Sequence, residues 1–188
     1  MGKHLFKMNS LAEKNMNQQE KATRNSWKSL QMLETKKQVS FERRFTEQEF
    51  EKISFGVIPQ QMEDKWFIFL EDMQLNFHRS WTGQCIYQIR FEKNIKEFII
   101  TEAWVNRNQE EYRNTDDDYD VALLSFLIDN FILGKNSPFP MPNDLPSNLP
   151  KGVYQHTVVG TGYPEAHTKL NLLSKTLNYI QSKLWRKS

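Results

Sequence analysis

Four apolar segments decide the fold: KWFIFL (65–70), QLNFHRSW (74–81), CIYQIRF (85–91) and EFIITEAWV (97–105). They are rich in aromatic and β-branched side chains, which is typical of strands. The connections between them are short and polar, and short connections of this kind join antiparallel neighbours. The sequence therefore predicts a meander of four antiparallel strands between residues 65 and 105.

The register of this sheet follows from its side-chain pattern. Because the side chains of a strand alternate between two faces, only certain registers gather the apolar residues on one side. These registers predict four opposed pairs: Leu70 with Leu75, Phe77 with Ile89, Ile89 with Ile100, and Phe91 with Phe98.

One row of the predicted sheet carries charge on the apolar face. It consists of Trp66, Arg79, Tyr87 and Glu102, and Trp81, Cys85 and Trp104 lie just beyond it. A buried arginine needs a partner. By strand spacing the backbones of Arg79 and Glu102 are roughly 10 Å apart, so their long side chains can meet over Tyr87.

Two interpretations of this row stay open. In the first, Arg79 and Glu102 form a buried ion pair that only fixes the sheet. In the second, the row is the floor of a pocket, and Arg79 faces an anionic or planar ligand between tryptophan walls. The candidate ligand-binding residues are then Arg79, Tyr87, Glu102, Trp66, Trp81 and Trp104.

Two helices are predicted around the sheet. Thr46 followed by Glu49 has the capping-box spacing, which begins a short helix over 46–53. The segment 118–133 is apolar over most of its circumference and precedes Gly134, so we expect a buried helix that covers the apolar face of the sheet. The predicted fold class is α+β, with residues 39–188 forming a single domain and helices packed on one face.

The C-terminal third is predicted to contain three parts. The five prolines of 135–152 favour an irregular surface crossing. A short strand over 153–159 follows, and then a helix over 164–185. The last helix has apolar residues at 3,4,3,4 spacing, which suits packing on the body, on a second copy or on a protein partner: Leu170, Leu173, Leu177, Ile180 and Leu184.

The N-terminal segment differs from the rest in charge. Residues 1–44 hold ten basic and four acidic side chains, whereas 45–188 hold 15 basic and 19 acidic ones. Residues 1–38 lack a periodic apolar face, so we expect a disordered or loosely helical basic arm whose deletion leaves the melting temperature nearly unchanged. The formal net charge of +2 gives no strong signal for a nucleic-acid partner beyond this arm.

Three observations bear on the compartment and on membrane association. The single cysteine excludes a disulfide within the chain, which fits a reducing compartment. The longest apolar stretch, 121–133, is interrupted by polar residues and is too short to span a bilayer. The first 15 residues lack the apolar run of a secretory signal. The prediction is a cytoplasmic protein without a membrane segment.

The remaining chemistry-bearing residues favour structural roles. His78 is predicted on the face opposite Arg79 as a solvated side chain, and Cys85 as an inert core thiol. Asp116, Asp117, Asp118 and Asp120 precede a helix and suit capping better than metal binding. The Gly-Thr-Gly turn at 160–162 lacks the third glycine of a dinucleotide motif. Neither a metal site nor a cofactor is predicted.

Several strings in 64–128 resemble a bacterial family. They are WF (66–67), FHRSWTG (77–83), CIY (85–87), AWVNR (103–107) and DDDYD (116–120). The family is associated with chains that carry ADP-ribosylglycohydrolase or other ADP-ribose-related domains. The resemblance covers roughly residues 60–135 and implies a shared fold and a connection to nucleotides. It implies no activity of its own, because that connection rests on domain association.

Three functions remain open, and the sequence does not decide whether the chain is an enzyme. The leading hypothesis is a non-catalytic module that binds a nucleotide-like or other anionic planar ligand around Arg79. The second is an enzyme acting on an ADP-ribose-like nucleotide, with Glu102 as general acid or base. The third is a protein-interaction domain that uses the C-terminal helix. Solvent access to Glu102 discriminates the first two, since a carboxylate needs an open cleft for chemistry.

Overall fold

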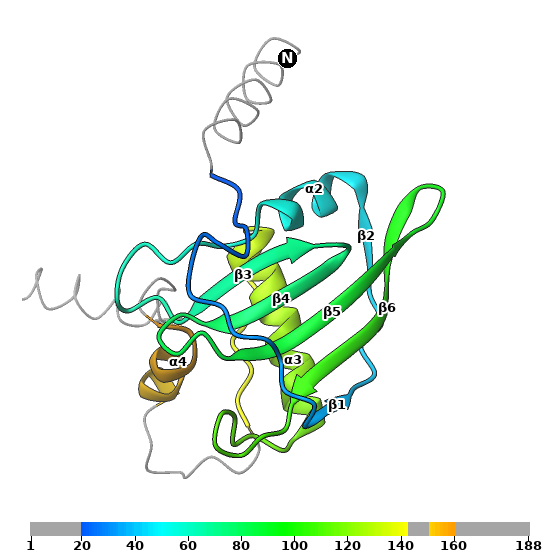
Figure 1. Ribbon diagram of the computed structural model, residues 1–188. Helices are drawn as coiled ribbons and strands as arrows, with labels where there is room; N and C mark the ends of the chain where they lie inside the picture. The colour runs from blue at the N-terminus through cyan, green and yellow to red at the C-terminus, as the bar shows by residue number, and fades with distance from the viewer. Residues whose placement is uncertain (1–19, 143–150, 161–188) are drawn as a thin grey trace, which may run out of the picture.

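The computed structural model describes residues 20–142 and 151–160. Its architecture is α+β, with one antiparallel sheet and helices packed against it (Figure 1). The strands are β1 (Lys36–Gln38), β2 (Arg44–Thr46), β3 (Trp66–Glu71), β4 (Gln74–Arg79), β5 (Cys85–Lys93) and β6 (Glu97–Asn106). The helices are α2 (Glu47–Phe55), α3 (Asp117–Leu127), the π-helix η1 (Ile128–Ile132) that continues α3, and α4 (Lys151–Val159).

The sheet contains the predicted meander and extends beyond it. Strands β3, β4, β5 and β6 lie in sequential order, as their short connections predict. Asp72 and Met73 turn the chain between β3 and β4 with positive φ angles, the conformation of a two-residue hairpin loop. The sheet has six strands rather than four, because β1 and β2 both pair with the outer side of β6.

The predicted register holds only for the first hairpin. Leu70 lies opposite Leu75, as expected. In the other two pairs of strands the register is displaced, and irregularities at Phe77/His78 and Arg90/Phe91 mark β-bulges. Each bulge shifts the pairs beyond it by one residue, and the pairs nearest the hairpin turns are displaced as well, so the turns also differ from the predicted ones. A displacement by two residues keeps every side chain on its face, so alternation alone does not reveal it. The observed opposed pairs are Phe77 with Tyr87, Leu75 with Ile89, Ile89 with Ala103, and Phe91 with Ile100.

The two helices predicted around the sheet are confirmed, each with its expected beginning. The Thr46 side chain accepts a hydrogen bond from the Glu49 N–H, and the Glu49 side chain accepts one from the Thr46 N–H, so the capping box at α2 is complete. Asp116 accepts from two backbone N–H groups at the start of α3. After η1 the chain turns at Gly134, which has a φ of 67° as the helix-end prediction requires.

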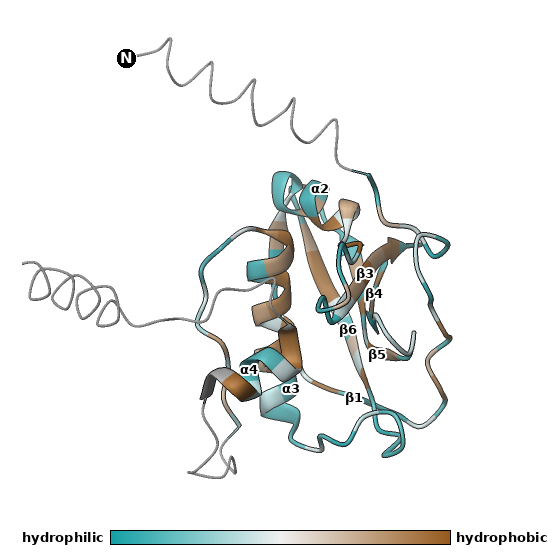
Figure 2. Ribbon diagram, turned by 90° about the vertical axis from the view of Figure 1, so that its left-hand side faces the viewer, coloured by the Kyte–Doolittle hydropathy of each residue, from teal (hydrophilic) through white to brown (hydrophobic). Residues whose placement is uncertain are grey.

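The hydrophobic core lies between the sheet and its helices, which share one face (Figure 2). Apolar side chains of α2, α3 and α4 meet those of the central strands there. This core is strongly aromatic, and Phe50 stacks on Phe98 with ring centroids 3.7 Å apart. Its largest fully buried side chains include Trp66, Tyr87, Phe45, Phe77, Phe91, Ile53, Ile68, Leu75, Ile86 and Ile89.

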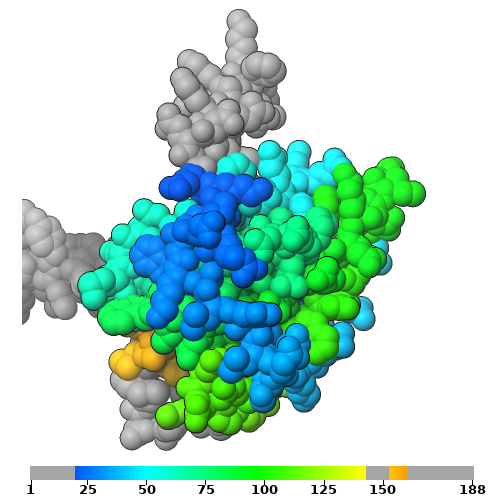
Figure 3. Space-filling view, viewed as in Figure 1, coloured from blue at the N-terminus to red at the C-terminus, as the bar shows by residue number. Residues whose placement is uncertain are grey.

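The prediction of a loose N-terminal arm is wrong for residues 20–38. This segment lies across the opposite face of the sheet (Figures 2 and 3). Ala22 packs against Phe67 and Phe69, Met32 is buried, and β1 pairs with β6. These contacts involve single side chains rather than a periodic stripe, so no helical or strand period reveals them. Residues 1–19 lie outside the described residues.

The strand predicted over 153–159 is also corrected, because this segment forms helix α4. Its alternating β-branched residues resemble a strand, but packing overrides that preference. Gln155, Val158 and Val159 are buried as one helical face. Of the proline-rich crossing, 135–142 is described and is irregular. The helix predicted over 164–185 lies outside the described residues.

Among the described residues, the structure contains no helix that is both long and apolar enough to cross a membrane.

Candidate functional site

Arg79 lies at the end of β4, beneath helix α4. It is directly opposite Trp66, and its guanidinium carbon is 4.2 Å from the centre of the Trp66 ring. Its Nη1 donates a 2.8 Å hydrogen bond to the Val158 carbonyl, which also accepts from the Trp66 indole at 3.0 Å. Val158 is in the last turn of α4, where helix carbonyls carry partial negative charge. Arg79 is therefore neutralised by a helix end rather than by a carboxylate.

Burial lowers the pKa of Arg79, and the surrounding tyrosines oppose that effect. A guanidinium nevertheless stays protonated throughout the physiological range. The residue is thus a permanent cation that anchors α4. Arg79 is not among the residues that line the cavities described within 20–142 and 151–160, and its role as a pocket floor stays a prediction.

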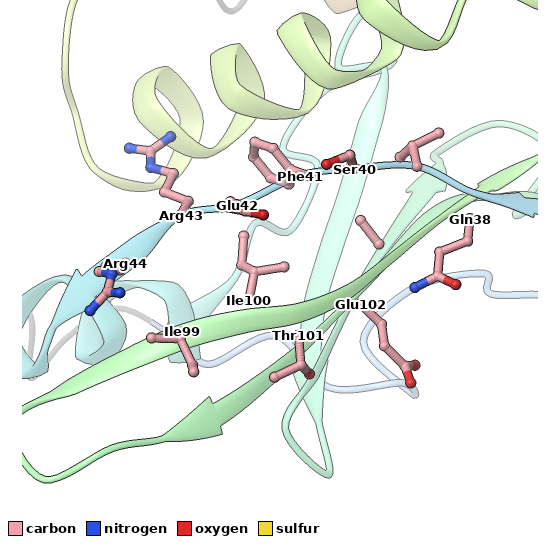
Figure 4. Close-up of a pocket in the computed structure, with 12 residues that line it drawn as sticks. Gln38, Ser40, Phe41, Glu42, Arg43, Arg44, Ile99, Ile100, Thr101 and Glu102 are labelled. Atoms are coloured by element: carbon pink, nitrogen blue, oxygen red, sulfur yellow. The ribbon is translucent and has the colours of Figure 1, made fainter.

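The predicted pairing of Arg79 with Glu102 is wrong. The bulge at Arg90/Phe91 places Glu102 opposite Arg90, so Glu102 projects from the other face of the sheet. Figure 4 shows the Glu102 side chain directed away from the helices, whereas Phe41 and Arg43 point toward them. Glu102 Oε2 lies 3.9 Å from Arg90 Nε, and its side chain is 45% exposed. The carboxylate is accessible, but it lies far from the buried cation that the enzyme hypothesis requires.

Arg107 and the fully buried Asp120 form an ion pair that sequence reasoning did not single out. Arg107 Nη1 lies 2.7 Å from Asp120 Oδ2, and its Nη2 lies 2.6 Å from Asp117 Oδ1. The other Asp120 oxygen accepts hydrogen bonds from Tyr87 Oη at 2.8 Å and Tyr112 Oη at 2.5 Å. Asp120 is fully buried.

This network has the properties of a structural clamp. Burial, followed by the charge of Asp120 and the neighbouring hydroxyl, raises the pKa of Tyr87 well above its usual range, and burial and Asp120 raise that of Tyr112. Both phenols therefore remain protonated donors. The network joins β5, the loop before α3 and α3 itself. A signal was present in the sequence: Asp120 is in phase with Leu123, Leu124 and Leu127 on the buried face of the helix.

The three candidate tryptophans do not form one wall. Trp66 is buried in the core, stacked 5.8 Å from Tyr87. Trp104 lies on the outer face, where Lys36 Nζ is 5.2 Å from its ring centre and its indole nitrogen is 3.3 Å from Glu102 Oε2. Trp81 lies in the turn after β4 and is 61% exposed. The structure brings Trp66, Arg79 and Tyr87 together and leaves Trp81, Trp104 and Glu102 apart from them.

Trp81 instead joins two other residues in what we call the indole patch, formed by Trp27, Met62 and Trp81. Their exposed fractions are 41%, 70% and 61%. Together with Gln61 and Ser80 they line an apolar hollow of about 170 Å³. Lys65 Nζ is 5.3 Å from the centre of the Trp81 ring. The patch thus combines apolar ring faces with a cation at its side.

Hydrogen bonds hold the two indoles of the patch in place. The Trp81 indole N–H donates to the Met62 carbonyl at 2.7 Å, and the Trp27 indole N–H donates to the Ser80 carbonyl at 2.8 Å. Ser80 Oγ donates to the Asp64 carbonyl at 2.5 Å, which ties the two turns together. Because their polar edges are satisfied by protein, the rings present their faces to solvent with little freedom to rearrange.

A second cavity is a slot of about 560 Å³ between residues 38–44 and β6 (Figure 4). It opens where the chain bows away from β6 between β1 and β2. Three of its charged residues already have partners: Arg43 pairs with Asp129, Arg44 with Glu97, and Glu102 with Arg90. The slot therefore offers a ligand less free charge and fewer apolar faces than its size suggests.

The remaining reactive side chains are enclosed. His78 is buried rather than solvated, stacked 5.3 Å from Phe69, with its Nδ1 2.9 Å from the Gly83 carbonyl. The N-terminal segment explains this burial, because Ala22 packs on Phe67 and Phe69 and the Arg24 guanidinium lies over the Phe69 ring on the same face of the sheet. Cys85 is buried as predicted, and burial raises the pKa of its thiol to about 12. Within residues 20–142 and 151–160, no group of three or more potential metal ligands is found.

Of the Gly-Thr-Gly turn, only Gly160 lies within the described residues. Gly160 ends α4, with a φ of 81° and its N–H donating to the His156 carbonyl. A β-carbon there would lie 2.1 Å from the Glu63 carbonyl oxygen, so glycine is required by a close backbone contact. This contact accounts for the glycine without a bound phosphate.

Comparisons of the chain with protein-family models, with curated proteins and with solved structures found no match.

Proposed function

We propose that this chain is a non-catalytic binding module and that its binding surface is the indole patch. The observation that carries this proposal is that Trp27 and Trp81 are fixed by hydrogen bonds yet expose their ring faces around an apolar hollow. Exposed, rigid aromatic side chains contribute large contact area at low entropic cost, which is why they dominate binding surfaces.

The ligand class follows from the size and charge of the patch. A hollow of about 170 Å³ is smaller than the roughly 300–1,000 Å³ that enclose a whole drug-sized ligand. It accommodates one planar ring stacked on Trp81, while the rest of the ligand stays outside. Lys65, whose ammonium lies over the Trp81 ring, supplies a positive charge for a phosphate or carboxylate. The proposed ligand is therefore a planar group attached to an anion, as in a nucleotide.

The enzyme hypothesis has less support. Glu102 is accessible, but the nearest cation is the exposed Arg90 rather than Arg79. His78 and Cys85 are buried, and burial lowers the pKa of His78, so neither is presented to a substrate. General acid–base chemistry needs a titratable group within reach of a bound substrate. A binding function requires only the geometry that the indole patch already has.

A thermal-shift titration with AMP and ADP-ribose tests the proposal. A ligand present at 100 times its dissociation constant stabilises the folded state by about 2.7 kcal/mol. We expect a concentration-dependent rise in melting temperature for the native sequence and its loss in Trp81→Ala. The matched control is Trp104→Ala, which removes a partly exposed tryptophan outside the patch and should keep the response.

Two results would contradict the proposal. Equal responses of the native chain and Trp81→Ala would place the ligand elsewhere. A response lost in Trp104→Ala but kept in Trp81→Ala would favour the slot beside β6, which Glu102 lines. The cytoplasmic location and the nucleotide connection of the resembling bacterial family remain predictions, supported by the single cysteine and by the HRSWTG string (78–83).

A further inference from the structure

Of the buried side-chain nitrogens in the part of the chain that the structure describes, Nε2 of His78 is the one without a hydrogen-bond partner. The side chain is 2% exposed, and its ring centre lies 5.3 Å from that of Phe69. Its Nδ1 lies 2.9 Å from the Gly83 carbonyl, which can only accept, so Nδ1 carries the proton of the neutral ring. Nε2 therefore holds a lone pair in an apolar enclosure.

Residues 22–30 close this enclosure from the outer face of the sheet, across which the N-terminal segment runs (Figure 3). Ala22 packs on Phe67 and Phe69, the two rings that His78 contacts. The strands on either side of His78 are hydrogen-bonded to β4. Water therefore reaches Nε2 at the lowest cost when residues 22–30 lift from the sheet while its strands stay paired.

The same stretch carries one wall of the indole patch. The Leu30 N–H donates at 2.8 Å to the Gly83 carbonyl, which is also the acceptor of His78 Nδ1. Three positions earlier in the chain, Trp27 lines the apolar hollow and donates to the Ser80 carbonyl. Lifting this stretch therefore takes one of the two indoles away from the hollow.

A protonated His78 would find no compensating charge, since neither ring nitrogen has a carboxylate partner within the described residues. The charged and titratable side chains that the surrounding elements place around the ring include Arg24, Lys28, Lys65, Glu71 and Cys85. Three of these are cations, and the carboxylate is already paired with Arg24. Burial raises the pKa of the Cys85 thiol to about 12, so that group stays neutral. Burial, to which the charge of Arg24 adds, lowers the pKa of His78 against the opposing effect of the Gly83 carbonyl.

We infer that protonation of His78 lifts residues 22–30 from the sheet and thereby withdraws Trp27 from the indole patch. The consequence for binding rests on the proposed function of the patch: the planar ligand is held at neutral pH and released in acid.

The direction of this pH dependence follows from the access of water to Nε2 in the two states. Water solvates Nε2 once residues 22–30 have lifted, so the lifted state takes up the proton at a higher pH than the docked state does. The lifted fraction therefore grows by up to about tenfold for each pH unit below the ordinary His pKa of 6.5, until the docked state is itself protonated. Above that pH the segment stays docked.

The test follows the indole N–H signals of the full chain in its ¹H–¹⁵N spectrum between pH 7.5 and pH 5.5. Trp27→Phe and Trp66→Phe assign two of these signals. As the pH falls, we expect the Trp27 signal to move toward the position of an unstructured indole. The Trp66 signal should stay in place, because its indole N–H is bonded to the Val158 carbonyl inside the core.

The variant His78→Phe keeps an aromatic ring in the stack and takes up no proton, so its Trp27 signal should stay in place over the whole range. The matched control is His156→Phe, which removes an exposed histidine and should keep the native movement. A Trp27 signal that stays fixed in the native chain, or moves equally in His78→Phe, would overturn the inference. So would joint movement of the Trp27 and Trp66 signals, because the whole domain would then be unfolding.

The native chain supplies a second measurement that does not depend on the folding of a variant. The ring C–H signals of His78 titrate with the uptake of its proton. Their midpoint should coincide with that of the Trp27 indole movement, because the two events are one transition. Separate midpoints would show that another group lifts the segment.

Titration with ADP-ribose at the same two pH values separates this inference from the proposed function. If both hold, the dissociation constant of the native chain rises by about threefold or more at pH 5.5, where most molecules have lost the Trp27 wall, and that of His78→Phe stays nearly constant. If ADP-ribose moves neither the Trp27 nor the Trp81 signal at pH 7.5, the proposed ligand class fails. The response of the Trp27 signal to pH without ligand still decides whether His78 controls the segment.

Discussion

Arg107 and Asp120 form an ion pair inside the domain. Asp120 alone fixes the positions of several neighbouring side chains. Asp120 accepts from Tyr87 and Tyr112 while it pairs with Arg107. A buried carboxylate needs compensation for its charge, and here Oδ1 accepts both phenolic hydrogen bonds, whereas Oδ2 is compensated by the charge of Arg107 alone. Removing one partner would leave charge uncompensated, so the cluster specifies how α3 and the preceding loop sit on the sheet.

His78 is the residue from which we predict a pH dependence of stability. Burial lowers its pKa below the ordinary value of 6.5, so the unfolded chain takes up the proton before the folded one does. Stability should therefore fall as the pH drops below about 6.5. In His78→Phe the ring still stacks on Phe69, and the Gly83 carbonyl keeps the hydrogen bond from the Leu30 N–H.

Chemical denaturation at pH 7.5 and pH 5.5 measures this effect. The free energy of unfolding should drop less between these values in His78→Phe than in the native sequence. His156→Phe is the control, since His156 is exposed, and it should retain the native drop. Identical pH profiles for the native chain and His78→Phe would assign the dependence to other groups.

At the scale of elements, α4 depends on two side chains of the sheet. Trp66 and Arg79 both donate to the Val158 carbonyl, and the Tyr154 hydroxyl donates to that of Tyr119 at 3.1 Å. A nine-residue helix is marginal without such contacts. The end of the helix, rather than a carboxylate, is thus the partner of the half-buried Arg79.

Arg79→Leu should therefore release α4 more than it destabilises the whole domain. A hydrogen bond to a charged group contributes about 1.5–3 kcal/mol, so amide hydrogen exchange in 151–160 should accelerate by about tenfold or more. Hydrogen-exchange mass spectrometry measures this change.

A buried ion pair of Arg79 with Glu102 would give a different result, a cost of about 3–5 kcal/mol for Arg79→Leu that Glu102→Leu would largely restore. Because Glu102 lies on the other face, we now expect no such recovery in the double variant. The control is Arg90→Leu, which removes the actual neighbour of Glu102 and should leave exchange in α4 unchanged. Recovery by Glu102→Leu would show that the two side chains communicate after all.

At the scale of the whole molecule, the sheet is covered on both faces. Helices cover one face, and residues 20–38 cross the other, where Ala22 packs between Phe67, Phe69 and the turn at Gly56. The N–H of Ala22 donates to the Phe55 carbonyl, and Arg24 pairs with Glu71. The segment is therefore part of the domain, although its composition resembles a solvated tail.

Ala22→Glu tests whether this covering matters. Placing a carboxylate among Phe67 and Phe69 should lower the free energy of unfolding by at least about 2 kcal/mol. Lys21→Glu, one position away and exposed, should change it by less than about 0.5 kcal/mol. Thermal and urea denaturation measure both. Indifference to Ala22→Glu would support the expectation from composition that residues 1–38 can be deleted with little change in melting temperature.

The parts of the fold that the sequence predicts are those with local, periodic signals. The strands at 65–105, the capping box at Thr46 and the apolar helix before Gly134 are all present. The candidate site could not be predicted in the same way. The prediction for Glu102 counts alternate residues along β6 to find the face on which each side chain lies. The bulge opposite Arg90 adds one residue to that count, so Glu102 lies on the opposite face. Trp27 belongs to the indole patch because its indole N–H donates to the Ser80 carbonyl, and no sequence pattern predicts that contact.

The bowed path from β1 to β2 also bears on how this protein avoids polymerising. An uncovered strand at the side of a sheet can template another chain, and β6 would be such a strand. Residues 36–46 occupy both ends of it, and the bow between them interrupts the straight run of backbone groups that an incoming strand would need. At the other side, Val57 bridges to Ile68 on β3. The same short strands that finish the sheet thereby protect it from fibril-like growth.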